Sequence, residues 1–244
     1  MKTVVNPQQK CFSDFAKTIH RQFENEGTVI YKKRNEIRVF NVNGTAVNVK
    51  RFKVPHLMNR VVYTFFRKSK AQRSFEYAVK LKAMGVETPE PVAYIHTKQG
   101  GLLHYSYYIS LQADSHWSMM KFGKDDMEVH MHILEAFASF TAQLHEKGIY
   151  HKDYSFANIL LKEACGNICF CLVDLNRMKF GFVSPARGSV NFARISIPNP
   201  DFECIIRKYA HKRNADAEQC LKIALQAKQK FWKRYARKHP LHFE

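Results

Sequence analysis

The sequence lacks any apolar run that approaches the roughly 18–20 residues that a membrane-spanning helix needs. The longest candidates, such as LLHYSYYISL at residues 102–111, are aromatic and typical of a β-strand. Residues 1–12 also lack the continuous apolar core of a secretory signal. We therefore expect a cytosolic protein.

Paired C-x-x-C motifs are absent as well, which argues against a zinc site or a dithiol redox site. Cys169 and Cys171 lie in the apolar, strand-like run ICFCLVDL, so buried free thiols are expected. The six cysteines are scattered along the chain, at Cys11, Cys165, Cys169, Cys171, Cys204 and Cys220.

Acidic residues are few relative to basic ones. The chain has 39 Lys and Arg against 21 Asp and Glu, which leaves a formal net charge of +18. Such a surplus indicates an anionic partner. Nucleic acid, an anionic membrane surface and a phosphorylated substrate would each satisfy it.

Two zones concentrate this positive charge. Residues 51–73 hold seven Lys or Arg and no acid, with aromatic side chains between them. Residues 221–238 place Leu221, Leu225 and Trp232 near helical spacing, which predicts an amphipathic helix with a basic outer face. Each zone is either a solvated basic surface or a docking surface for an anionic membrane.

The first half of the chain is rich in predicted strands. Short β-branched and aromatic runs occur within residues 28–52 and again within 91–112. Asn43-Gly44 between two of these runs is a strong hairpin signal.

Two longer segments have helical periodicity. Residues 69–84 are predicted to form a helix that ends at Gly85. Residues 127–148 are predicted to form a longer helix, with Asp125 or Asp126 as its N-terminal cap. Strands with one main helix, followed by mostly helices, predict an α+β protein in two lobes. We expect a nucleotide-binding lobe at 1–112 and a catalytic lobe at 113–244.

A dense group of polar residues interrupts the apolar run IYHKDYSFANILL at residues 149–161. His151, Asp153 and Asn158 form the pattern H-x-D-x-x-x-x-N, and Asp174 ends an apolar strand 21 residues after Asp153. Phosphoryl transfer from ATP requires a carboxylate near the attacking hydroxyl and oxygen ligands for magnesium. This pattern contains both.

The same reaction requires a cationic side chain that contacts the phosphates of ATP. It also requires an acidic side chain that holds this cation in position. Lys50 ends the run VNVK in the third predicted strand, and Glu76 lies within the next predicted helix. Lys50, Glu76, Asp153 and Asp174 therefore follow one another in the order that a kinase fold requires.

At these residues the sequence resembles a known group. HKDYSFANILL and VDLN look like the catalytic loop and metal-binding turn of the protein-kinase-like superfamily. More closely, the chain resembles the Kdo/WaaP lipopolysaccharide kinases, which phosphorylate sugars of the lipopolysaccharide inner core. VNVKRFKVP, FEYAVKLKAMGVETPEPVAY and VDLNRM follow that family in order and spacing, over roughly residues 28–200.

The resemblance implies a role for each matched residue. Lys50 would contact the α- and β-phosphates of ATP, and Glu76 would pair with Lys50. Asp153 would accept or orient the proton of the sugar hydroxyl, and His151 would brace the loop. The two Mg²⁺ ligands would be Asn158 and Asp174.

The sequence also departs from protein kinases. The hairpin YKKRNEIRVF has no G-x-G-x-x-G, and we expect Lys32, Lys33 and Arg34 to contact phosphate in its place. Ser155 stands where protein kinases carry a Lys, and the metal-binding turn reads Asp174-Leu175-Asn176. No A-P-E follows, so a peptide-docking segment has little room and a compact acceptor is favoured.

The resemblance therefore implies an ATP- and Mg²⁺-dependent kinase acting on Kdo-lipid A, with Kdo as the preferred acceptor and heptose as its nearest competitor. We expect a monomer at the cytoplasmic face of the inner membrane, contacting it through residues 51–73 and 221–238, with no nucleic-acid partner. Two alternatives stay open. One is a protein or small-molecule kinase of the same fold, and the other is a non-catalytic basic module that binds RNA or anionic membrane.

Overall fold

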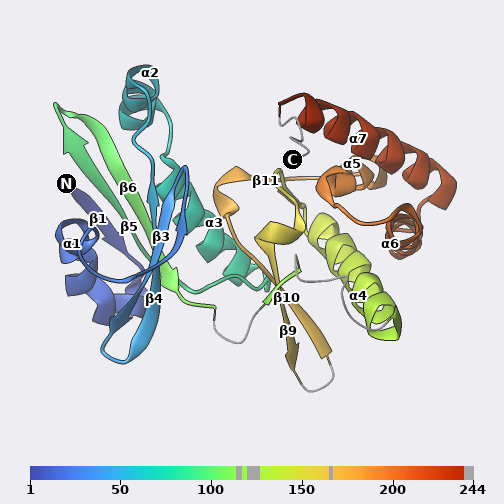
Figure 1. Ribbon diagram of the computed structural model, residues 1–244, viewed down its shortest axis with the longest axis horizontal. Coiled ribbons are helices and arrows are strands. Elements are labelled where there is room, and N and C mark those ends of the chain that lie inside the picture. Colours follow the sequence, from blue (N-terminus) through green and yellow to red (C-terminus); the bar gives the residue numbers. More distant parts are fainter. Residues whose placement is uncertain (114–116, 120–126, 165–166, 239–244) are drawn as a thin grey trace, which may run out of the picture. The chain divides into compact units, whose positions relative to one another are not determined.

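The computed structural model describes residues 1–113, 117–119, 127–164 and 167–238 (Figure 1). The chain forms two compact units, Met1–Asp114 and Ser115–Glu244. No helix among the described residues is both long enough and apolar enough to cross a membrane.

A six-stranded antiparallel sheet forms the first unit, with strand order β1-β5-β6-β4-β3-β2. This sheet confirms the predicted β-rich first half. The strands are β1 (Lys2–Val5), β2 (Thr28–Lys32), β3 (Glu36–Val42), β4 (Thr45–Phe52), β5 (Pro91–Gln99) and β6 (Leu102–Leu111).

The turn between β3 and β4 is the one that the sequence predicts. Asn43 and Gly44 both have positive φ, 52° and 81°, and Val42 pairs with Thr45 across them. Two consecutive residues in the left-handed conformation match the right-handed twist of the strands that flank a two-residue hairpin loop. Asn and Gly adopt this conformation at little energetic cost. This turn fixes the register of β4 and therefore the face on which Lys50 lies.

Helices cover both faces of this sheet (Figure 1). The short helix η1 (Pro7–Phe12) leads into α1 (Ser13–Gln22), whose Ile19 packs with Val49 in the larger apolar cluster. On the other face, α3 (Lys70–Ala83) packs Phe75 against Phe52. The helix α3 confirms the predicted helix at 69–84, whereas α1 was not among the predicted elements.

The ends of α3 have the expected chemistry. Ser69 caps its N-terminus by accepting a hydrogen bond from the amide of Gln72 at 3.1 Å. Gly85, with φ of 67°, follows its C-terminus. Between β4 and α3, the basic zone forms the short helix α2 (Leu57–Val61) and the π-helical turn η2 (Val62–Phe66).

The second unit is mostly helical. Its sheets are a three-stranded one of order β10-β9-β7 and a two-stranded one that pairs β11 with β8. Its helices are α4 (Met127–Glu146), α5 (Pro185–Asn191), α6 (Asn199–Lys212) and α7 (Ala217–Lys238), with short turns η4 (Phe156–Asn158), η5 (Leu175–Arg177) and η6 (Phe192–Arg194). Its strands are β7 (Trp117–Ser118), β8 (Ile149–His151), β9 (Ile159–Ala164), β10 (Asn167–Leu172) and β11 (Met178–Phe180).

Aromatic side chains form the core of this unit. Phe137 of α4 is fully buried and its ring contacts the rings of Tyr154, Phe156, Phe170 and Phe192. These rings come from residues 154–156, β10 and η6, so α4 holds these segments together. The helix α4 confirms the predicted long helix, while its proposed caps at 125 and 126 lie outside the described residues.

Two sequence predictions need correction or refinement. Cys171 is buried as expected, but Cys169 is exposed. Residues two apart share one face of a strand, so the difference lies along β10: Cys169 is nearer the start of the strand and pairs with Lys162, whereas Cys171 pairs with Leu160. The predicted C-terminal helix is confirmed as α7, with Leu221 buried and Tyr235 45% exposed near its end.

Candidate active site

Lys50 lies on the face of the first unit's sheet that carries α3. Its ammonium is 5.3 Å from the centre of the Phe52 ring, and Phe52 packs against α3. Tyr108, its cross-strand partner on β6, packs against the same cluster. Because successive side chains of a strand alternate between faces, Arg51 lies on the opposite face.

Glu76 lies on α3, so the sequence-predicted Lys50 and Glu76 share one face of the sheet. The Glu76 carboxylate accepts hydrogen bonds from the Lys68 ammonium at 2.7 Å and from the Gln72 amide at 2.9 Å. Lys68 is well exposed, so this ion pair contributes little to stability. Glu76 can exchange Lys68 for another cation at small cost.

The three hairpin cations Lys32, Lys33 and Arg34 lie at the turn between β2 and β3. They line a pocket of about 420 Å³ together with Arg51 and Lys53. Because Arg51 faces α1, this pocket opens on the face of the sheet opposite to that of Lys50.

The catalytic-loop segment of the second unit follows β8, where His151 is fully buried. The Asp153 amide donates to Nδ1 of His151 at 3.0 Å, so Nδ1 carries no proton. The other nitrogen, Nε2, therefore carries the proton and donates to the Val173 carbonyl at 3.2 Å. Burial lowers the pKa of His151, which keeps the ring neutral in this bracing role.

Two guanidinium groups hold the carboxylate of Asp153. Arg177 approaches Oδ2 at 3.3 Å, and Arg194 contacts Oδ1 directly. Arg194 in turn lies over the Phe231 ring of α7, 5.0 Å from its centre. This arrangement surrounds the proposed hydroxyl-orienting carboxylate with positive charge.

Asn158 and Asp174 are joined through the backbone. The Val173 amide donates to the Asn158 carbonyl at 3.0 Å, which sets Asp174 directly beyond Asn158. The Asn158 side-chain amide donates from Nδ2 to the Asp153 carbonyl at 2.8 Å, leaving its Oδ1 as an oxygen ligand. Asp174 has φ 56° and ψ 49°, and its Oδ1 accepts a hydrogen bond from Asn176 at 2.7 Å.

The donor set at Asn158 and Asp174 fits magnesium. An amide oxygen and a carboxylate are the hard ligands that Mg²⁺ prefers, and it takes its remaining ligands from water and substrate phosphates. The left-handed backbone of Asp174, unusual for a residue other than glycine, is the kind of strain found at functional sites.

A buried hydrogen-bond network braces this loop from behind. The Asn191 side-chain amide donates to the His151 carbonyl at 2.9 Å and accepts from Nε2 of His145 at 3.0 Å. The Tyr209 hydroxyl donates to Nδ1 of His145 at 2.9 Å and accepts from Arg213 at 3.0 Å. Three helices, α4, α5 and α6, thereby fix the position of the loop.

Sequence reasoning did not single out Arg177, Arg194, His145 or Asn191. Arg177 follows the metal-binding turn directly, and its position beside Asp174 was the one local signal available. Arg194, His145 and Asn191 come from elements far along the chain, and no motif marks them.

The elements described above define a class of protein. A sheet strand with Lys50, a helix with Glu76 on the same face, and a helical unit with the loop 151–158 and Asp174 constitute the protein-kinase-like fold. The model of the "Lipopolysaccharide kinase (Kdo/WaaP) family" matches residues 19–194, and the chain belongs to this family. By this membership it is a phosphotransferase, a lipopolysaccharide core kinase that uses ATP.

A solved structure described as "WaaP in complex with acyl carrier protein" has the same fold. The two chains superpose with a TM-score of 0.66 at 15% sequence identity, over 98% of this chain and 99% of that one. No curated protein matches the sequence significantly. The WaaP likeness confirms the mixed α/β fold with its antiparallel sheet and helical C-terminal part.

Proposed function

We propose that the protein transfers the γ-phosphate of ATP to a sugar hydroxyl of the lipopolysaccharide inner core, with Kdo of Kdo-lipid A as the preferred acceptor and heptose as the next. The observation that carries the proposal is the loop geometry, with Asp153 between two arginines and Asn158 beside Asp174. Family membership supports the reaction class. The preference for Kdo rests on resemblance alone.

The proposed chemistry assigns one role to each group. Lys50 binds the α- and β-phosphates, and Glu76 directs Lys50. Asn158 and Asp174 would hold Mg²⁺, which would supply positive charge against the phosphates. Asp153 orients the acceptor hydroxyl and takes its proton. The hydroxyl oxygen bonds to the γ-phosphorus as the bond to the β,γ-bridging oxygen breaks, and ADP leaves.

Arg177 and Arg194 supply a function that the loop itself lacks. Protein kinases carry a Lys two residues after the catalytic Asp, where this chain has Ser155. We infer that the two guanidiniums provide the missing positive charge against the transferred phosphoryl group. A planar guanidinium binds phosphate oxygens in pairs, which suits this role.

The short segment that follows the metal-binding turn also favours a compact acceptor. β11 begins at Met178, directly after η5, and α5 begins at Pro185, within eleven residues of Asp174. A docking segment for a peptide therefore has little room. We propose a sugar hydroxyl over a protein side chain on this basis.

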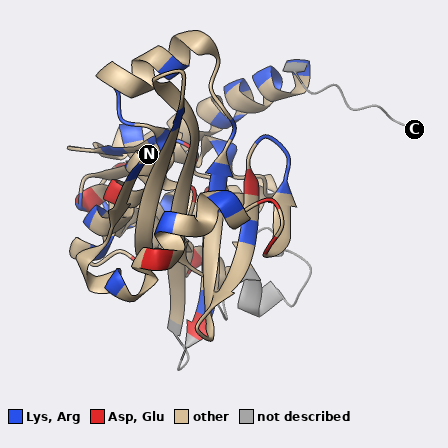
Figure 2. Cartoon of the chain, turned by 90° about the vertical axis from the view of Figure 1, so that its left-hand side faces the viewer, with Lys and Arg blue, Asp and Glu red and all other residues tan. Residues whose placement is uncertain are grey.

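The proposed site of action is the cytoplasmic face of the inner membrane, where the lipid-linked acceptor is held. The basic segments 51–73 and 221–238 are the proposed membrane contacts, and charge supports this. Lys and Arg outnumber Asp and Glu along the chain (Figure 2). Lys32, Lys33 and Arg34 stay predicted contacts of the ATP phosphates, although they line a pocket on the sheet face opposite to that of Lys50. Single Ala substitutions with ATP affinity as the readout test this prediction, and an unchanged affinity would leave these cations to another anion.

The test incubates the purified protein with ATP, Mg²⁺ and Kdo-lipid A and measures phosphate on the glycolipid. Asp153→Ala should abolish transfer, whereas Asp14→Ala, which removes an exposed acid of α1, should not. Chelation of Mg²⁺ should also stop the reaction. Phosphate on protein instead of glycolipid would favour a protein kinase, and salt-sensitive RNA binding without ATP turnover would favour a binding module.

A further inference from the structure

The segment formed by α2 and η2 exposes an unusual amount of apolar surface. Met58 and Phe66 are 81% and 80% exposed, and Leu57 and Phe65 are 66% and 68% exposed. Soluble proteins rarely leave a group of large apolar side chains in water without a partner. In Figure 1, α2 lies at the edge of the sheet, near the end where β5 and β6 turn.

Specific hydrogen bonds hold this segment in place. Arg60 donates to the carbonyls of Leu103 and Gln99, at 2.8 and 2.7 Å, and so ties α2 to the β5–β6 hairpin. The Thr64 hydroxyl accepts from the Leu103 amide at 2.9 Å and donates to the Arg60 carbonyl. The apolar side chains are therefore presented by an anchored element, which lowers the entropy cost of binding.

The basic pocket on the α1 face lies at the base of this segment. Lys53 and Val54 line it and lead directly into α2, and the Lys53 amide donates to the Asn35 side chain at the β2–β3 turn. Five cations line the pocket, namely Lys32, Lys33, Arg34, Arg51 and Lys53, against one carboxylate, Glu36.

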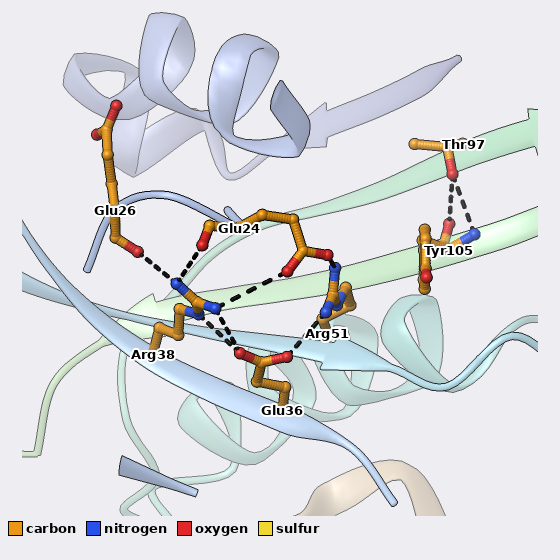
Figure 3. Close-up of polar contacts among 7 residues, drawn as sticks. All are labelled: Glu24, Glu26, Glu36, Arg38, Arg51, Thr97 and Tyr105. Atoms are coloured by element: carbon orange, nitrogen blue, oxygen red, sulfur yellow. Dashed lines mark hydrogen bonds and ion pairs between the residues drawn. The ribbon is translucent and has the colours of Figure 1, made fainter. Parts of the chain in front are cut away.

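Ion pairs and ring contacts hold the side chains that form the floor of the pocket (Figure 3). Arg51 lies between the rings of Phe23 and Tyr105, 4.5 and 4.7 Å from their centres. Both oxygens of Glu36 are occupied, by Arg38 at 2.7 Å and by Arg51 at 2.8 Å. The one acid of the lining is thus paired within the floor, where Arg51 also contacts Glu24. Lys32, Lys33, Arg34 and Lys53 are the other cations of the lining.

We propose that these two features form one membrane-docking surface, in which α2 and η2 insert Leu57, Met58, Phe65 and Phe66 into the bilayer and the adjacent basic pocket takes the phosphate of an anionic lipid headgroup. The inference rests on the proposed function, because a lipid-linked acceptor places the enzyme at a bilayer. It adds a second anion site, on the sheet face opposite to Lys50.

A bilayer fits this surface better than a protein partner does. The apolar side chains project from a protruding segment, and fluid lipid accommodates such a wedge without a matching cavity. Stable membrane anchoring usually combines apolar insertion with a second attraction, such as a basic patch. The pocket would supply this positive charge. No acid lies between residues 51 and 73 to oppose an anionic surface.

The apolar half is tested by sedimentation of the full chain with vesicles of phosphatidylcholine alone and mixed with phosphatidylglycerol. The double variant Phe65→Ser/Phe66→Ser should lower binding to the mixed vesicles about tenfold or more. The matched control is Phe182→Ser, which removes an 83% exposed phenylalanine from the second unit and should leave binding unchanged. Equal binding by wild type and the double variant overturns the proposal.

The pocket is tested with Lys33→Ala/Lys53→Ala. Each cation near an anionic surface strengthens binding about fivefold, so this variant should lose binding to mixed vesicles and keep its weaker binding to neutral ones. The control Lys10→Ala/Lys17→Ala removes the same charge from η1 and α1. An equal loss in both double variants shows diffuse attraction and contradicts the pocket.

A water-soluble, deacylated acceptor separates this proposal from the kinase activity. Phe65→Ser/Phe66→Ser should phosphorylate that acceptor at the wild-type rate. If wild type transfers no phosphate to either acceptor but binds vesicles as described, the proposed function fails and the docking surface stands. If wild type binds a purified acidic carrier protein and no vesicle of either composition, the docking proposal is wrong.

Discussion

At the scale of single residues, the proposed mechanism depends most on Asp153. Its carboxylate is paired with two guanidiniums from different elements, η5 and η6. A base so placed is oriented by its partners before substrate arrives. The same partners lie where a phosphoryl group bonded to the acceptor oxygen would need positive charge.

Arg194→Ala should therefore lower kcat for glycolipid phosphorylation by about 100-fold, because a charge that acts on the transition state is lost. KM for ATP should change little. The control is Arg207→Ala, which removes an exposed cation paired with Glu218. A raised KM with unchanged kcat would contradict this role, and partial recovery in Arg194→Lys would support it.

His145 should make stability depend on pH. Burial lowers its pKa to about 4, so the folded state favours the neutral ring. The neutral ring stabilises the fold fully above the unfolded pKa of about 6.5, and this contribution is lost as pH falls through the folded pKa. The loss from this one group approaches about 3 kcal/mol.

Urea unfolding at a series of pH values checks this. The wild type should lose more stability on acidification than His145→Gln, whose own stability at neutral pH is lower. His96 in the first unit also has its pKa lowered to about 4 by burial, so a shallow pH dependence remains in the variant. Identical pH slopes for the two proteins would be inconsistent with a neutral buried His145.

At the scale of elements, α5 is packed so closely that one of its positions admits no side chain. A Cβ on Gly188 would lie 2.6 Å from Nδ1 of His145 and collide with the Tyr209 hydroxyl. Both groups belong to the network that braces the catalytic loop. The close approach of α5 to α4 and α6 thus depends on this glycine.

Gly188→Ala should destabilise the protein by about 3 kcal/mol and lower activity together with stability, because the network must open to admit the methyl group. Thermal unfolding measures the first effect and the transfer assay the second. Val190→Ala, at a 41% exposed position of the same helix, should change stability by less than about 0.5 kcal/mol. Wild-type stability in Gly188→Ala would show that α5 can move away from α4 and α6 at no cost in free energy.

Elements with turn or cap signals could be predicted from the sequence. The turn at Asn43-Gly44 and the helix ending before Gly85 depend on the conformations of a few adjacent residues. The helix α1 has no such signal at its start, since no side chain caps its N-terminus. Its buried residues Phe12, Ala16, Ile19 and Phe23 do recur at helical spacing, so α1 could have been predicted from periodicity alone.

The same distinction applies to the site. His151, Asp153, Asn158 and Asp174 lie within 24 residues and form a recognisable pattern. Arg194 reaches Asp153 from another element, 41 positions further along the chain, and its role depends on tertiary packing that no spacing encodes.

At the scale of the whole molecule, the proposal divides one reaction between two units. Lys50 and Glu76 belong to the first, and Asp153, Asn158 and Asp174 belong to the second. If all five act on one nucleotide, their energetic contributions must depend on one another.

Lys50→Ala and Asp174→Ala should each lower kcat by about 1,000-fold or more, and the double variant should be little worse than either single one. Groups that stabilise one transition state together are strongly non-additive. Single-turnover transfer from ATP gives the three rates. A double variant whose loss is the product of the single losses would mean that the two residues act independently.

Mass spectrometry of Kdo-lipid A after incubation with the enzyme, ATP and Mg²⁺ tests the central claim most directly. The account predicts one added phosphate on the sugar, produced by the wild type and missing with Asp153→Ala. An unmodified glycolipid in the presence of active, folded wild-type protein would contradict it.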